Sequence, residues 1–142
     1  MPRFAPYGYV RQHLAITVPF TGFLSVATAA NLMLSKTLGF AAELEKVEFV
    51  TTVVGTGTSA SRTINVRKGS ATGTLCGTLN PTLANQGTLG AVLAGTVTTT
   101  AGANLFGDSD TLTIEFPASG TAFTAGGGDL ILTLRVRAAR LA

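Results

Sequence analysis

The sequence predicts an all-β fold, in which seven or eight short antiparallel strands form a two-layer β-sandwich or a barrel. Three observations support this prediction. Apolar and polar side chains alternate most clearly over residues 129–137, and a period of two residues is typical of strands rather than helices. Glycine-rich turns separate the apolar stretches, and the 142 residues include 17 Gly and 23 Thr. Charged residues make up only 12%, whereas ordinary domains carry about 25%.

Length and composition indicate one folded domain. A hydrophobic share of 46% argues against disorder, and the scarcity of charge argues against a coiled coil. Residues 1–11 contain two prolines, so we expect an extended N-terminal arm there and a single β-sandwich domain over residues 12–142. Two interpretations of the arm stay open. Phe4, Tyr7 and Tyr9 dock on a neighbouring molecule, or the arm packs on its own domain.

The first strand is expected at residues 12–20. Basic residues followed by an uncharged stretch also allow a signal peptide or a membrane span here. Polar and helix-breaking residues interrupt the stretch, however, and Leu14, Ile16, Val18 and Phe20 alternate with other residues as in a strand. We therefore expect no membrane segment. Residues 23–42 are ambiguous, because their apolar residues fit either a helical face or a continued strand.

Two further strands are predicted at residues 44–54 and 62–68, which are rich in β-branched residues or alternate in polarity. Ile64 and Val66 are expected to point inward. Because a Gly-Thr-rich loop joins the two segments, the pattern indicates a β-hairpin.

Residues 69–107 contain no charged side chain, yet they are too apolar for a flexible linker. We expect one or two strands with loops in this stretch, and a Thr-rich strand near residues 96–100. Such an uncharged surface suits burial against another protein, or it is a threonine-covered sheet face in contact with water.

The last two strands are expected at residues 111–116 and 129–137, with a turn at residues 125–128 between them. In the first, Leu112, Ile114 and Phe116 point inward, and Thr111, Thr113 and Glu115 point outward. In the second, Leu130, Leu132, Leu134 and Val136 share the inward face.

No motif for catalysis is recognisable, so we expect no enzyme, no catalytic or metal site and no cofactor. His13 is the only histidine, and Cys76 is the only cysteine and is expected to be buried, which leaves too few ligands for a zinc site. Asp108 and Asp110 are expected to form a turn rather than a calcium site. We expect a strand edge in contact with water to contain Glu43, Glu45 and Glu48, with Lys46 between them.

The net charge of +3 comes from scattered lysines and arginines, so nucleic-acid binding is not expected. Arg135, Arg137 and Arg140 form the only basic group, which either pairs with carboxylates of a partner or keeps the tail in water. The candidates for contact with a partner are therefore Arg3, Phe4, Tyr7, Tyr9, Arg11, Arg135, Arg137 and Arg140.

Residues 44–137 resemble a known family in the residue pattern of their strands and the placement of their turns. The pattern consists of Val47–Lys68 around Gly-Thr-Gly-Thr, then Leu105–Asp108, Leu112–Ile114, Phe123–Gly126 and Leu130–Leu134. It is similar to the small jelly-roll decoration, or cement, proteins on the capsids of tailed bacteriophages. Tail and fibre components of these phages share this pattern of strand residues and turns.

The resemblance implies a jelly-roll-like β-sandwich that is made in the host cytoplasm and binds the outer capsid surface of the virion. There it would bridge subunits of the major capsid protein and help the shell to resist internal DNA pressure. The implied partners are the major capsid protein and further copies of this chain, as a homodimer or homotrimer, without nucleic acid or membrane. The alternatives are a tail or fibre component, or a carbohydrate-binding sandwich. The absence of Trp argues against the latter.

Overall fold

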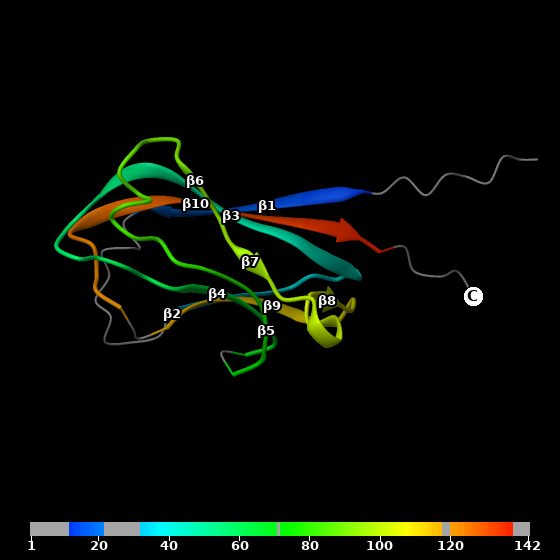
Figure 1. Ribbon diagram of the computed structural model, residues 1–142. Helices are drawn as coiled ribbons and strands as arrows, with labels where there is room; N and C mark the ends of the chain where they lie inside the picture. The colour runs from blue at the N-terminus through cyan, green and yellow to red at the C-terminus, as the bar shows by residue number, and fades with distance from the viewer. Residues whose placement is uncertain (1–11, 22–31, 71, 118–119, 138–142) are drawn as a thin grey trace, which may run out of the picture.

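The structure is a computed structural model that describes residues 12–21, 32–70, 72–117 and 120–137. These residues form two antiparallel β-sheets of five strands each, stacked as two layers, without an α-helix (Figure 1). The all-β prediction and the two-layer arrangement are confirmed. The strands are β1 (His13–Thr21), β2 (Leu32–Thr37), β3 (Ala42–Thr56), β4 (Ile64–Lys68), β5 (Thr74–Leu79), β6 (Val92–Ala94), β7 (Thr96–Val97), β8 (Leu105–Phe106), β9 (Thr111–Phe116) and β10 (Ala125–Val136), and η2 (Thr100–Gly102) is a 3₁₀ turn.

One sheet, called sheet A, has the order β1-β10-β3-β6, with β8 also paired to β3, and sheet B has the order β2-β9-β4-β5-β7. The strand pairs are nested along the chain. β1 pairs with β10, β2 with β9, β3 with β6 and β4 with β5, each antiparallel. Ten strands replace the predicted seven or eight, because β6, β7 and β8 have only two or three residues each and are too short to show alternation.

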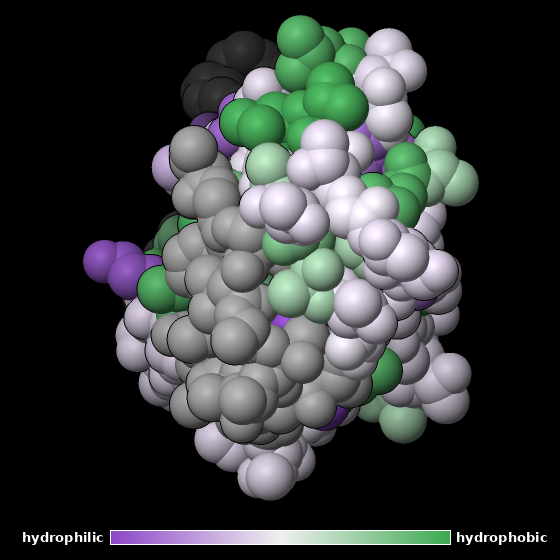
Figure 2. All heavy atoms as spheres, turned by 90° about the vertical axis from the view of Figure 1, so that its left-hand side faces the viewer, coloured by the Kyte–Doolittle hydropathy of each residue, from purple (hydrophilic) through white to green (hydrophobic). Residues whose placement is uncertain are grey.

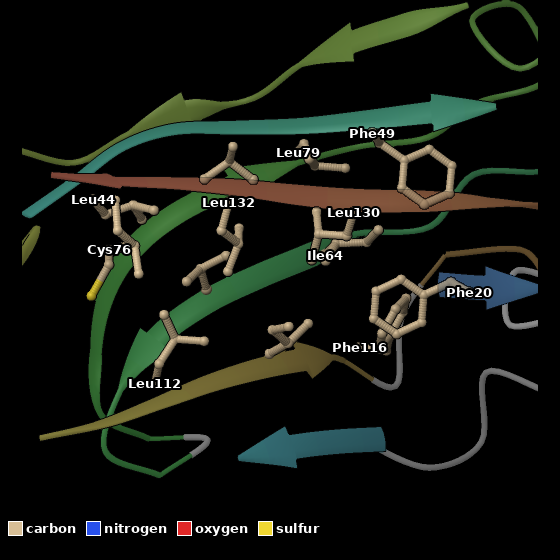
Figure 3. Packing of buried hydrophobic residues seen from close by; sticks show 14 of the residues in the cluster. Phe20, Leu44, Phe49, Ile64, Cys76, Leu79, Leu112, Phe116, Leu130 and Leu132 are labelled. Atoms are coloured by element: carbon tan, nitrogen blue, oxygen red, sulfur yellow. The ribbon is translucent and has the colours of Figure 1, made fainter. Parts of the chain in front are cut away.

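A single apolar layer fills the space between the sheets (Figure 3). The inward positions predicted for β4, β9 and β10 are confirmed, since Ile64, Val66 and the three leucines of β10 are fully buried. Phe20 at the end of β1 meets Phe116 of β9 edge-to-face, with ring centroids 4.9 Å apart, and this contact joins the two sheets. Cys76 is buried in the same layer, as predicted.

The chain closes one side of the sandwich by crossing from sheet A to sheet B at Gly95. β6 pairs with β3, and β7, two residues later, pairs with β5. The Gly95 amide donates to the Val47 carbonyl at 2.7 Å, and a Cβ at Gly95 would lie 2.7 Å from the Thr78 carbonyl oxygen. Glycine is therefore required at this crossing. On the opposite side, no described strand crosses between the edge strands β1 and β2.

The predicted hairpin of residues 44–54 and 62–68 is wrong, because β3 lies in sheet A and β4 lies in sheet B. The connecting segment is held at the end of the sandwich. Ser61 bridges to both Thr82 and Thr121, and the Arg62 amide donates to the Pro81 carbonyl at 2.9 Å. Both strands bury apolar residues in the same layer, but from opposite sheets, and alternation cannot distinguish this arrangement from a hairpin.

Other predicted elements changed in extent or type. The first strand is confirmed as β1, whereas residues 32–37 form the strand β2 and not a helix; residues 22–31 lie outside the described residues. The predicted turn at 125–128 belongs to β10. A Cβ at Gly128 would lie 2.5 Å from the ring of Phe49, so this glycine makes room for a core aromatic side chain. The predicted strand near residues 96–100 is only β7, followed by the 3₁₀ turn.

Leu132→Asp should prevent folding, because it places a carboxylate in the centre of the apolar layer, where Leu132 is fully buried. We expect a loss of more than about 4 kcal/mol in the free energy of unfolding, measured by thermal and urea denaturation followed by circular dichroism. The control is Thr133→Asp, which faces outward opposite Lys46 of β3 and should melt like the parent. Equal melting of both variants would show that the assignment of faces is wrong.

Gly95→Ala should cost about 1–3 kcal/mol in the free energy of unfolding, because the added methyl group overlaps backbone atoms at the crossing between sheets. Gly87→Ala is the matched control, since a Cβ there has only ordinary contacts of 3.6 Å or longer. Equilibrium denaturation of both variants measures the difference. A Gly95→Ala protein as stable as the control would contradict the proposed need for glycine at this crossing.

Candidate functional site

An apolar groove lies between β1 of sheet A and β2 of sheet B, on the side of the sandwich that no described strand crosses. Its volume is about 120 Å³, and we call it the seam groove. Leu34 on its rim is 44% exposed, although it faces the same interior layer as its partner Ile114. The groove is lined by Ile16, Val18, Leu34, Ser35, Lys36, Leu38, Leu112 and Ile114. As far as the described residues are concerned, the interior apolar layer is therefore accessible from outside along this side.

In the described part of the chain, no strand pairs with the outer edge of β1 or of β2, and both edges have features that discourage strand addition. The Gln12 carbonyl accepts a hydrogen bond from the Val136 amide. The backbone groups of even-numbered β1 residues therefore bond to β10, and those of odd-numbered residues point away from the sheet at its edge. Pro19 is one of these outward residues and has no N–H to offer. On β2, Lys36 lies opposite the buried Leu112, which places a charge on the inward side of an edge strand. Both features disfavour extension of either sheet by an added strand.

The acidic residues of β3 do not lie at a strand edge, which corrects the sequence prediction. β3 is flanked by β10 on one side and by β6 and β8 on the other. Arg135 of β10 is hydrogen-bonded to Glu43 and lies 3.4 Å from Glu45, while Nε2 of His13 lies 2.9 Å from Glu45. The contact with Glu43 raises the pKa of Arg135. Arg135 is therefore engaged within its own chain, and its contact with a partner stays a prediction.

A polar row crosses the outer face of sheet B. Glu115 accepts from Nε of Arg67 at 2.7 Å and from Nδ2 of Asn65 at 3.1 Å, and Thr78 donates to Asn65 at 2.9 Å. Glu115 and Thr113 lie on the outer face as predicted, but both are buried rather than open to water. The row links β5, β4 and β9 and has a structural role, because its carboxylate is already held by a cation and an amide.

Arg62 is fully buried and has no hydrogen-bond acceptor for its guanidinium nitrogens among the described residues. Burial lowers its pKa. All seven carboxylate side chains of the protein belong to the described residues, and none of them forms an ion pair with Arg62. Sequence reasoning missed this residue, although the alternation that placed Ile64 and Val66 inward also puts Arg62 on that side.

One end of the sandwich holds both Gln12 and Arg137, the first and last described residues (Figure 1). Two open depressions of about 570 and 510 Å³ lie there, and Phe40 and Val136 line both. Arg137 is exposed and lines the second. The remaining residues predicted to contact a partner lie outside the described residues, namely Arg3, Phe4, Tyr7, Tyr9, Arg11 and Arg140.

Other chemically notable residues have structural surroundings. Burial raises the pKa of the Cys76 thiol to about 11, so the thiol stays protonated at neutral pH. Asp110 closes a turn by accepting from the Gly107 amide at 2.7 Å, as predicted. The described residues contain no group of three or more His, Cys, Asp or Glu side chains arranged for a metal ion. In the same ranges, no helix has the length and apolar character needed to cross a membrane.

Among the described residues, the most exposed large apolar side chains lie in and next to β6. Leu89 is 64% exposed and Val92 is 60% exposed, and hydrogen bonds between residues 90–91 and Thr51 hold this segment along β3, where Val53 is also exposed. Figure 2 shows hydrophobic residues gathered at the top of this face, where Figure 1 places the segment leading to β6. We call Val53, Leu89 and Val92 the β6 patch.

A comparison of the chain with known family models, curated protein sequences and solved structures finds no match. The function is therefore argued from the two apolar surfaces, the seam groove and the β6 patch. Sequence reasoning did not locate the groove, because its position depends on which strands lie at the sheet edges.

Arg62→Met and Arg67→Met should change stability in opposite directions. Arg62→Met removes a buried charge that has no described partner and keeps the side-chain volume, so the free energy of unfolding should rise by about 1 kcal/mol or more. Arg67→Met removes the cation beside buried Glu115 and should cost about 3–5 kcal/mol. Urea denaturation of both variants tests this. A loss of stability in Arg62→Met would show that Arg62 has a stabilising partner.

Proposed function

We propose that this protein is a capsid decoration protein, which binds the outside of a phage head, bridges major capsid protein subunits and stabilises the shell. The observation that carries this proposal is the β6 patch, a set of exposed apolar side chains of which Leu89 and Val92 belong to the charge-free stretch of residues 69–107. Interface cores are depleted of charge, and exposed apolar patches mark sites where proteins associate.

The uncharged residues 69–107 supply β5, β6, β7 and β8, so this stretch builds part of each sheet and its surroundings. A decoration protein needs such a surface, because each contact with the shell can be modest when several copies bind together. Bridging two subunits makes the second contact effectively intramolecular, which strengthens binding without new contacts. A homodimer or homotrimer would multiply this effect.

The strand order supports the jelly-roll part of the proposal. The nested antiparallel pairs β1–β10, β2–β9, β3–β6 and β4–β5 are those expected when one long hairpin is rolled into two sheets. Setting aside the two-residue strands β7 and β8 leaves eight strands, the number typical of jelly rolls. Jelly rolls serve many functions, so this likeness supports the architecture and not the partner.

The test uses shells assembled from the major capsid protein encoded in the same genome. The parent protein should co-sediment with the shells and raise their rupture temperature. The double variant Leu89→Lys and Val92→Lys should bind at least about tenfold more weakly, because it places charge in the centre of the contact. Thr17→Lys, an exposed position on the outer face of β1, is the matched control and should bind like the parent.

Absence of both co-sedimentation and a rise in rupture temperature would contradict the proposal. Labelled antibody on intact virions then decides the alternative of a tail or fibre component, by showing the label on the tail instead of the head.

A further inference from the structure

We propose that the end of the sandwich that holds Gln12 and Arg137 binds an acidic surface of the shell, through Arg11, Arg137 and Arg140. We call these three arginines the basic end. This inference rests on the proposed function and adds a second contact, of different chemistry, to that of the β6 patch. A protein that bridges two subunits needs two separate contacts of this kind.

The net charge of the protein belongs to its terminal segments. All seven Asp and Glu side chains lie among the described residues, where seven Lys and Arg side chains balance them. The other three cations of the chain are Arg3, Arg11 and Arg140, and they account for the whole net charge of +3. Pairing within the chain cannot remove this excess, so complementary charge is available only from outside the molecule.

Chain connectivity keeps the basic end together. The Val136 amide donates to the Gln12 carbonyl at 2.8 Å, so the start of β1 and the end of β10 lie side by side (Figure 1). Arg11 directly precedes Gln12, and consecutive Cα atoms are only about 3.8 Å apart. Arg140 is three residues after Arg137, so their Cα atoms lie within about 11 Å of each other. The three arginines therefore gather at this end in any arrangement of the terminal segments.

The described carboxylates at this end are too few to balance the basic end. Glu43 and Glu45 of β3 are already in contact with Arg135 and His13. Among the described residues that line the two open depressions, Asp108 is the only carboxylate. One carboxylate cannot balance three guanidinium groups, so this end presents positive charge to a partner.

The chemistry of this end fits a protein surface better than a nucleic acid. Its cations are all arginines, which pair with carboxylates through two parallel hydrogen bonds and are enriched in protein interfaces, whereas lysines are depleted there. Phe40 and Val136 line both depressions and supply apolar surface for contact with protein side chains. A nucleic-acid site needs a stripe of cations, and the described residues, whose charges balance, provide none.

The basic end and the β6 patch are separated along sheet A. Ala42 of β3 pairs with Val136 beside the basic end, and Val50 of the same strand pairs with Val92 of the patch. The eight-residue step from Ala42 to Val50 spans about 27 Å of extended strand. One molecule can therefore contact one subunit through the patch and a neighbouring subunit through the basic end.

The first experiment compares two variants with the same change in net charge. The double variant Arg137→Gln and Arg140→Gln should bind DNA-free shells of the major capsid protein about tenfold more weakly than the parent, in about 0.05 M sodium chloride. The double variant Lys36→Gln and Lys46→Gln changes two exposed cations elsewhere and should bind like the parent. Equal binding by the arginine variant and the parent would overturn this inference and leave the proposed function intact. A parent that does not bind would overturn both.

The second experiment separates the two contacts by their response to salt. In about 0.5 M sodium chloride the parent should lose about tenfold in affinity, and the arginine variant should lose little, because salt screens charge pairs. The double variant Leu89→Ser and Val92→Ser should bind more weakly than the parent at both salt concentrations and keep the parent's response to salt. A parent whose affinity is the same at both concentrations would contradict an acidic partner surface.

The third experiment distinguishes carboxylates from phosphates as the ligands of the basic end. Binding of a labelled DNA duplex is followed by fluorescence anisotropy in about 0.15 M salt, where the parent should bind the duplex more weakly than the shells. Duplex binding as tight as shell binding, and lost in the arginine variant, would show that the basic end binds nucleic acid and would overturn the proposal.

Discussion

The apolar layer between the two sheets is the constraint on which the rest of the structure depends. Charged residues are so few that solvent-exposed ion pairs contribute little to the stability of the fold. Burial of aliphatic and aromatic side chains, at roughly 25 cal/mol per Å² of apolar surface, must supply most of it. A layer between two sheets has two open sides, and each must be closed by the chain or by something else. The crossing at Gly95 closes one, and the seam groove marks the other.

The two sides of the sandwich expose different apolar surfaces. The β6 patch lies beside the edge strand β6, whereas the seam groove lies beside the edge strands β1 and β2. Under the proposed function, a molecule binds a shell through the β6 patch, which leaves the opposite side of the sandwich available for other contacts. A homodimer or homotrimer would bring several such patches together, which is the arrangement that makes weak contacts effective.

The sequence predicted the faces of the strands better than their partners. Alternation identified the inward positions of β9 and β10 correctly, because a period of two residues depends only on local backbone geometry. It failed for the supposed hairpin of β3 and β4, since two strands that bury the same layer from opposite sheets have the same pattern. The glycines of residues 126–128 were interpreted as a turn, whereas Gly128 is needed in a strand to accommodate the ring of Phe49. The groove could not be predicted, because it depends on sheet order.

The loop between β3 and β4 has a practical consequence. Gly57, Thr58 and Ser59 are exposed, and the residues that follow them are fixed to the rest of the sandwich by the bridges of Ser61. The loop lies at the end of the molecule away from Gln12 and Arg137 (Figure 1). A foreign peptide grafted between Thr58 and Ser59 would thus be presented to the surroundings, which makes this position suitable for a display scaffold.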